Sequence, residues 1–428
     1  MMNTVFLLYT TLNSKHDPML AIPKQLYYLV LAILSTAALN AGGLYLYELS
    51  TTETSMAGAG WAARAQDPTT TITNPAGMTR LDGTQIQLTA QPLAIDSSFS
   101  SDQGGNSNLD SVLPGGSVFA THRLNEQWTA GISIAGFFGL GLDYDSGWDG
   151  RYYVDEITLQ SVGLQPTLAY RINDQFSIGM GITWIYTVFE QKMSINNSLQ
   201  GDGMAKFDDN THSMQFNLGI LYEPDARTRF GLQYLSESEF ELKTRPKVQG
   251  NGPASNVLRN IGKVDLDMTM PQSLMLSAFH QLSDQWAVMG NIGWQEWSEF
   301  GKVDIDAFSE SVSTSITADR NYKDTWNFAL GLQYQFNQAW RLNTGVAYDT
   351  EMVDEDDVTP DLPTGDSWRY GIGASYAYSE TVQISAGYEI VWYGNVDMEV
   401  ERGLTGKVSG RYKDHAIHFF GFSVNWLL

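Results

Sequence analysis

The 428-residue sequence predicts an all-β fold, a transmembrane antiparallel β-barrel of about fourteen strands with an N-terminal plug. Apolar and polar residues alternate with a period of two over most of the chain. The alternating segments reach about ten to fifteen residues, whereas strands of soluble proteins average about five or six. Short polar turns alternate with longer irregular stretches between these segments. Period, strand length and turn pattern together favour a barrel that crosses a membrane.

The composition excludes several classes of protein. The formal net charge of −23 argues against a nucleic-acid partner, because phosphates attract Lys and Arg. The chain has no cysteine, which excludes disulfides and zinc-thiolate sites, and no metal site or cofactor is predicted. A soluble chain of this length usually divides into about two or three domains, whereas one large barrel accommodates it.

Residues 1–41 are predicted to be a signal peptide. In KQLYYLVLAILSTAALNA, residues 24–41, a lysine precedes a short apolar run that ends in small residues, as in a cleaved secretion signal. The apolar run is too short for a comfortable membrane span. Cleavage is expected near Asn40 or Ala41, and Met19 is an alternative start of the chain.

Residues 42–83 are predicted to form the plug. They are too polar and too rich in small residues to cross a membrane. A barrel of about fourteen strands is wider than the small barrels that side chains fill, so a folded segment of this size could occupy it. The stretch ITNPAGMTRL is then a turn within the plug, in which Asn74 caps, Pro75 fixes φ and Gly77 permits a tight bend. An ordinary periplasmic tail is the alternative.

Residues 84–428 are predicted to form the barrel. In the segment 175–188, large apolar side chains share one face, and Ser, Gly and Thr share the other. The segments 84–90, 339–348 and 381–392 follow the same pattern. The apolar face would point inward in a soluble sandwich and toward lipid in a membrane barrel. Trp and Tyr near the strand ends, and alternation through the last residue, favour lipid.

The connections between the segments predict the number of strands. Short polar turns are expected at 123–127, 171–175, 223–228, 281–285, 336–339 and 378–381. Longer stretches lie at 96–112, 139–155, 191–210, 242–266, 301–323, 350–366 and 394–413. Their alternation gives about fourteen strands with both ends of the barrel on the side of the short turns. This is the pattern of bacterial outer-membrane barrels, and closure leaves no unpaired edge in lipid.

The predicted plug also carries a motif. After a glycine-rich start it contains AGAGWAARAQDPTTTITNPAGM, residues 57–78. This region resembles the N-terminal hatch of the FadL/TodX family of hydrophobic-compound transporters, and the resemblance continues through 137–181 and resumes in the last strand. The residues that match the hatch are Glu48, Gly58, Gly60, Asp67, Asn74, Pro75 and Ala76.

The resemblance implies passive uptake of long-chain fatty acids or small aromatic hydrocarbons across the outer membrane. Family members capture ligand between outer loops, pass it to an interior pocket and release it sideways through a gap where the third strand kinks inward. The implied partners are hydrophobic small molecules, outer-membrane lipid and lipopolysaccharide, and a monomer is expected. A monoaromatic hydrocarbon channel and a general diffusion porin remain alternatives, and an adhesin or receptor role is open.

The resemblance also suggests candidate site residues. The inward kink is expected in IAGFFGLGL, at Gly136, Phe137, Phe138 and Gly139, because glycine in a strand often marks a bulge. The alternative is that these glycines merely fit the curvature of the barrel. By their order in the chain, 191–210 and 242–266 correspond to the loops of the outer groove.

Arg151, in DGRYY, is a candidate for binding a fatty-acid carboxylate. The alternative is a salt bridge that braces the loop through Asp145, Asp149 or Asp155. The acidic run at 354–361 lacks the glycine and final glutamate of a calcium-binding loop and is expected to be a solvated outer loop. The chain contains no G-x-S-x-G, G-x-x-x-x-G-K-[ST] or H-E-x-x-H motif, and it is not predicted to be an enzyme.

Overall fold

A computed structural model describes residues 46–109, 111–308, 313–401 and 406–428. The predicted signal peptide, residues 1–41, lies outside the described residues, as do the first residues of the predicted plug. None of the helices in the described ranges is long and apolar enough to span a membrane.

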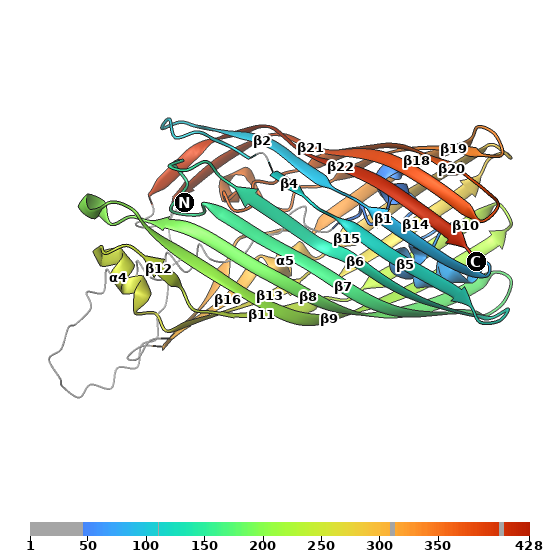
Figure 1. The fold of residues 1–428 in the computed structure, drawn as a ribbon, viewed down its shortest axis with the longest axis horizontal. Coiled ribbons are helices and arrows are strands. Elements are labelled where there is room, and N and C mark those ends of the chain that lie inside the picture. The colour runs from blue at the N-terminus through green and yellow to red at the C-terminus, as the bar shows by residue number, and fades with distance from the viewer. Residues whose placement is uncertain (1–45, 110, 309–312, 402–405) are drawn as a thin grey trace, which may run out of the picture.

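In the described residues, fourteen antiparallel strands close into a ring, which confirms the predicted strand number (Figure 1). Each strand pairs with the next, and β1 pairs with β22 to close the barrel. The strands of the ring are β1 Thr84–Ala90, β5 Gly116–Arg123, β6 Trp128–Asp143, β7 Glu156–Arg171, β8 Phe176–Ile195, β9 Gly203–Asp225, β10 Thr228–Leu235, β14 Ser273–Gln281, β15 Trp286–Gln295, β18 Thr325–Gln335, β19 Trp340–Asp349, β20 Ser367–Ala377, β21 Val382–Glu401 and β22 Lys407–Leu427.

Shorter strands extend this ring. β2 (Leu93–Ser101) pairs with the part of β22 that precedes its pairing with β1. β2 also pairs with β3 (Ser107–Asn108) and β4 (Ser111–Leu113). A second sheet continues the strands β10, β14, β15 and β18 beyond the ring, and β12 pairs with β9. These strands are β11 Ser238–Thr244, β13 Lys263–Met270, β16 Lys302–Phe308, β17 Ser313–Asp319 and β12 Lys247–Gln249. The helices are α2 Thr51–Met56, α3 Thr70–Thr73, η1 Pro75–Arg80, η2 Ser198–Gln200, α4 Pro253–Arg259, α5 Trp297–Phe300 and η3 Glu355–Asp357.

All the predicted short turns join neighbouring strands of the ring, at one end of the barrel, which we call the turn end. Several contain an asparagine whose side chain closes the turn. Asn125 Oδ1, for example, accepts hydrogen bonds of 2.9 Å from the N–H groups of Gln127 and Trp128. Asn173 and Asn337 make the same pair of bonds in their own turns. The asparagine thus supports the backbone hydrogen bonds that also close each turn, such as the one from the Leu124 N–H to the Trp128 carbonyl at 2.9 Å.

The opposite end, which we call the loop end, contains less irregular chain than expected. The stretches 191–210, 301–323 and 394–413 were predicted as loops, yet β8, β9, β16, β17, β21 and β22 occupy most of them. These strands continue past the apolar outer face, where lipid no longer requires one apolar side. Backbone pairing persists there because it satisfies the N–H and C=O groups.

The two faces of the barrel strands differ as the alternation predicts. Leu330 and Ile372 point outward and are 56% and 62% exposed, whereas Thr183 and Gln165 point into the lumen and are fully buried. The exposed apolar side chains therefore cover the outer surface that faces lipid.

Candidate functional site

The N-terminal segment, residues 46–83, lies inside the barrel. Figure 1 shows it in dark blue within the ring of strands, toward the turn end. Its helix α2 contacts strands from β18 to β22, whereas α3 and η1 contact strands from β5 to β9. Nearly all its side chains are buried. The segment therefore bridges opposite walls of the lumen.

Polar side chains of the barrel hold the backbone of this segment. Asn291 accepts hydrogen bonds from the N–H groups of Gly60 (2.8 Å) and Trp61 (3.1 Å), and donates one to the Gly58 carbonyl (2.6 Å). Gln233 donates to the Ile72 carbonyl at 2.6 Å and accepts from the Trp61 indole at 2.7 Å. The segment has little secondary structure of its own, so these amides satisfy backbone groups that would otherwise be buried without partners.

Lumen-facing glycines make room for the segment. A Cβ on Gly231 would overlap the carbonyl of Ala62, and one on Gly345 would overlap the carbonyl of Met56. A Cβ on Gly371 would lie too close to the carbonyl oxygen of Thr54. Absence of a side chain thus allows two backbones to approach each other closely.

Within ITNPAGMTRL, Asn74 connects the segment to itself and to the wall. Its Nδ2 donates to the carbonyls of Ala62 (2.6 Å) and Ile220 (3.0 Å), and its Oδ1 accepts from the Ala76 N–H (3.0 Å) as the N-cap of η1. Pro75 begins this turn of 3₁₀ helix, where a missing N–H has no cost. Asn-Pro-Ala is therefore a turn that docks η1 against β9.

Replacing Asn74 with Ala should loosen this docking. Three hydrogen bonds are lost, two of them fully buried, and the expected cost of local opening is about 1–3 kcal/mol because the carbonyls of Ala62 and Ile220 lose a donor. Hydrogen exchange of the amides in 60–80 should accelerate accordingly. Asn173→Ala, in a turn outside the segment, is the matched control, and equal exchange in both variants would contradict the assignment.

The other residues of the predicted motif have separate roles. Gly58 and Gly60 have φ of 73° and 77°, a left-handed conformation that favours glycine. Asp67 Oδ1 accepts from the Thr69 N–H at 3.1 Å, and Asp67 lies 3.5 Å from Arg64. Arg64 also bonds to Glu53. Burial lowers the pKa of the Arg64 guanidinium, but the attraction of Glu53 and Asp67 outweighs it and the pKa lies above its usual value.

Glu48, the first motif residue, belongs to a group of buried charged side chains near the start of the segment. It bonds to Arg369 on β20, whose Nε lies 3.5 Å from Glu389 Oε1 and 3.4 Å from Asp349 Oδ2. The Arg369 guanidinium also lies over the ring of Tyr47. A cavity of about 40 Å³ adjoins this group. Arg369 and Asp349 line the cavity together with the apolar side chains of Trp297 and Met352.

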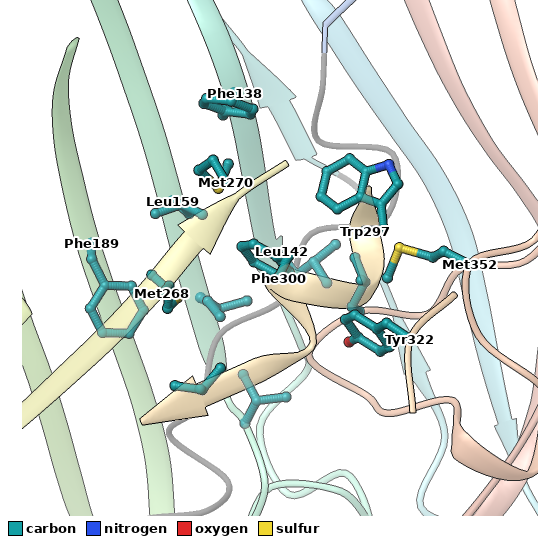
Figure 2. Close-up of a cluster of buried hydrophobic side chains, with 14 of the residues drawn as sticks. Phe138, Leu142, Leu159, Phe189, Met268, Met270, Trp297, Phe300, Tyr322 and Met352 are labelled. Atoms are coloured by element: carbon teal, nitrogen blue, oxygen red, sulfur yellow. The ribbon is translucent and has the colours of Figure 1, made fainter. Parts of the chain in front are cut away.

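Above the segment, the lumen is filled by apolar side chains. We call the residues labelled in Figure 2 the inner apolar cluster; all are buried. They come from β6, β7, β8, β13, α5 and the loop-end connections, and they are Phe138, Leu142, Leu159, Phe189, Met268, Met270, Trp297, Phe300, Tyr322 and Met352. The lumen is therefore polar where it holds the segment and apolar toward the loop end.

Sequence reasoning did not find this cluster, although β8 carries a signal for it. Up to Val188 most apolar side chains of β8 point outward, with Ile185 as an exception, whereas from Phe189 onward the buried positions are apolar except for Gln191 and the outward ones are polar. This inversion marks the point where the strand leaves the lipid and its inner face becomes apolar.

The third strand of the ring, β6, is interrupted where the glycines predicted a kink. Its pairing with β5 ends at Ala135, and its register with β7 shifts between Gly136 and Gly139. Phe137 and Phe138 are both buried although they are neighbours, which an extended strand does not allow. In the described residues, β6 has no ladder with β4 beyond Ala135.

The N-terminal segment covers this interruption. The Leu46 N–H donates to the Phe137 carbonyl at 3.2 Å. Leu46 Cδ1 lies 3.7 Å and 3.6 Å from the positions that a Cβ would take on Gly136 and Gly139. The start of the segment and the interrupted strand are thus in direct contact.

Arg151 lies in the loop between β6 and β7, away from the inner apolar cluster. It donates to Asp202 at 2.9 Å, to the Tyr152 hydroxyl at 2.8 Å and to the Trp148 carbonyl at 3.0 Å. The predicted partners Asp145, Asp149 and Asp155 bond elsewhere, to Asn108, Ser101 and Ser194 respectively. Arg151 therefore braces two loops through Asp202, which the sequence did not single out.

The comparison with known families identifies the barrel. A family model described as outer membrane protein transport protein (OMPP1/FadL/TodX) matches residues 31–426. The chain belongs to this family. The OMPP1/FadL/TodX assignment agrees with the resemblance of the hatch motif, and it places the barrel in the outer membrane. In outer-membrane barrels the short turns generally face the periplasm.

Individual relatives of the OMPP1/FadL/TodX family agree with this. A long-chain fatty acid transport protein of Escherichia coli O6:H1 is 27% identical over 363 residues, which cover 76% of this chain and 81% of that protein. Outer membrane protein P1 of Haemophilus influenzae is 26% identical over 367 residues, 74% and 79% of the two chains.

Solved structures share the fold. A Pseudomonas aeruginosa FadL homologue superposes with a TM-score of 0.81 at 20% identity, covering 90% of this chain and 100% of that one. The Pseudomonas putida toluene transporter TodX gives 0.67 at 15% identity, with coverage of 89% and 98%.

Proposed function

We propose that this protein is a channel for passive uptake of long-chain fatty acids or related hydrophobic compounds, with capture at the outer loops and lateral release into the membrane. The observation that carries the proposal is the interruption of β6 beside the inner apolar cluster. The cluster offers a hydrophobic solute an apolar environment, whereas the N-terminal segment fills the polar lumen below. An opening in the wall would let such a solute leave directly into lipid.

A general diffusion porin is less well supported. Such a channel needs a continuous water-filled lumen, but here the N-terminal segment and the inner apolar cluster occupy it in succession. The segment would act as the hatch, with movement of Leu46 away from Phe137 uncovering the interrupted strand.

Uptake of labelled oleate, toluene and a small sugar tests the proposal, in cells that lack their own carrier, with and without this protein. Oleate or toluene should enter faster with the protein, and the sugar should not. Equal acceleration of all three would contradict the proposal and favour a porin.

Arg151→Ala separates carboxylate binding from loop bracing. Because Arg151 is paired with Asp202 at the partly exposed loop end, we expect Arg151→Ala and Asp202→Ala to destabilise the barrel equally, by less than about 1 kcal/mol. Uptake of oleate and toluene should change in the same proportion in both variants. A selective loss of oleate uptake in Arg151→Ala would instead restore Arg151 as a carboxylate site.

A further inference from the structure

The charges beside the inner apolar cluster bear on the class of solute. Arg369 meets three carboxylates, those of Glu48, Glu389 and Asp349. Glu389 is fully buried, and neither of its oxygens accepts a hydrogen bond from any donor in the described residues. Even with one of the three carboxyl groups protonated, the group around Arg369 keeps a net negative charge.

A second buried arginine beside the cluster is also paired. Arg320 lies 3.3 Å from Asp361 and 3.4 Å from the hydroxyl of Tyr322, a member of the cluster. Both Arg320 and Asp361 are almost completely buried. Arg320 and Arg369 are therefore each neutralised by the protein itself.

These pairings set the cost of admitting an anion. A carboxylate moved from water into an apolar site costs several kcal/mol unless a cation and hydrogen bonds compensate it. A fatty-acid carboxylate entering between Trp297 and Met352 would reach Asp349 and an Arg369 that is already paired with Glu48, and would find no free guanidinium. An uncharged solute meets no such penalty.

The cluster itself can adapt to a neutral guest. Met268, Met270 and Met352 contribute flexible, polarisable side chains to it (Figure 2). Methionine changes rotamer at low cost and packs against aromatic and aliphatic groups alike. The lining can thus part around an apolar molecule without exposing a polar group.

We propose that the interior site selects uncharged hydrophobic molecules over fatty-acid anions, and that Glu48 and Asp349 provide this selectivity by outnumbering Arg369. This inference rests on the proposed channel function and narrows its substrate class. Hydrocarbons and other neutral apolar compounds are then the favoured solutes.

A matched pair of ligands tests the inference. Oleate and oleyl alcohol share one alkyl chain and differ in charge, so their binding to the purified full chain in detergent can be compared by competition with a neutral fluorescent probe. At a pH where oleate is ionised, oleyl alcohol should bind about tenfold more tightly or better, equivalent to about 1.4 kcal/mol. Asp349→Asn, which keeps the shape of a side chain that lines the cavity, should reduce this ratio several-fold.

Glu380→Gln is the control, because Glu380 is exposed in a turn at the far end of the barrel. It should leave the ratio unchanged. Oleate binding as tight as that of the alcohol would overturn the inference but leave the channel function intact, and so would equal effects of Asp349→Asn and Glu380→Gln. Failure of both ligands to bind would overturn the proposed function as well.

Discussion

Deleting residues 46–80 from the mature chain is expected to open the barrel to small hydrophilic solutes. The barrel wall does not depend on this segment, because the closed ring of strands pairs without it. The lumen side chains that now bond to the segment, such as Gln233 and Asn291, would face water after the deletion. The lumen of a fourteen-stranded barrel is intermediate in width between that of small barrels filled by side chains and that of open porins. Once emptied, it should let small hydrophilic solutes pass.

The inner apolar cluster should not seal the shortened protein. In the intact chain it is part of one continuous buried hydrophobic core with Tyr47, Leu49, Trp61 and Ile72, which all belong to the deleted segment. Without these four side chains, one side of the inner apolar cluster would be exposed to water and would lose its close packing. Uptake of a labelled sugar should therefore rise on the order of tenfold or more, as a filled lumen becomes an aqueous channel.

Point variants provide the controls for the deletion. Gly231→Val with Gly345→Val places side chains where the carbonyls of Ala62 and Met56 lie, and should displace the segment and admit sugar. Ala278→Val enlarges a side chain on the exposed outer face of β14 instead, and should not admit sugar. A deletion variant that folds and still excludes sugar would show that the segment is not the barrier.

The strand pattern could be predicted from the sequence because lipid imposes one simple condition on the outer face. Trp184 on β8 is 46% exposed and its neighbour Thr183 is buried, so alternation alone places them. The turns were equally local, since an asparagine such as Asn125 bonds to residues two and three positions later.

Contacts across the lumen could not be predicted in the same way. Glu48 and Arg369 are 321 positions apart, and their meeting depends on the tilt and register of the whole barrel. Arg151 selects Asp202 from another loop, although three aspartates lie closer in sequence. The hatch motif identified Glu48 and Asn74 as important, but only the structure shows which wall each residue contacts.

A disulfide across the interrupted strand is expected to stop uptake. Leu113, at the end of β4, lies with its Cγ 3.6 Å from the position that a Cβ would take on Gly141 of β6. A cysteine sulfur at position 113 would lie near the place of this Cγ, which brings the two side chains close to the geometry of a disulfide, whose Cβ atoms are about 3.5–4.5 Å apart. The chain has no cysteine, so Leu113→Cys with Gly141→Cys introduces a single defined pair.

If solute leaves between β4 and β6, oxidation of this pair should close its route and reduction should reopen it. We expect uptake in the oxidised state to fall below roughly a tenth of the reduced rate, because gate opening would limit passage. Leu276→Cys with Ile292→Cys, a pair across the continuous ladder of β14 and β15, is the matched control and should transport equally in both states. Full uptake by the cross-linked Leu113–Gly141 variant, with the disulfide verified by mass spectrometry, would place the exit elsewhere. Since the N-terminal segment blocks the polar lumen in that case too, its movement would then have to open an axial path past Leu46 and η1.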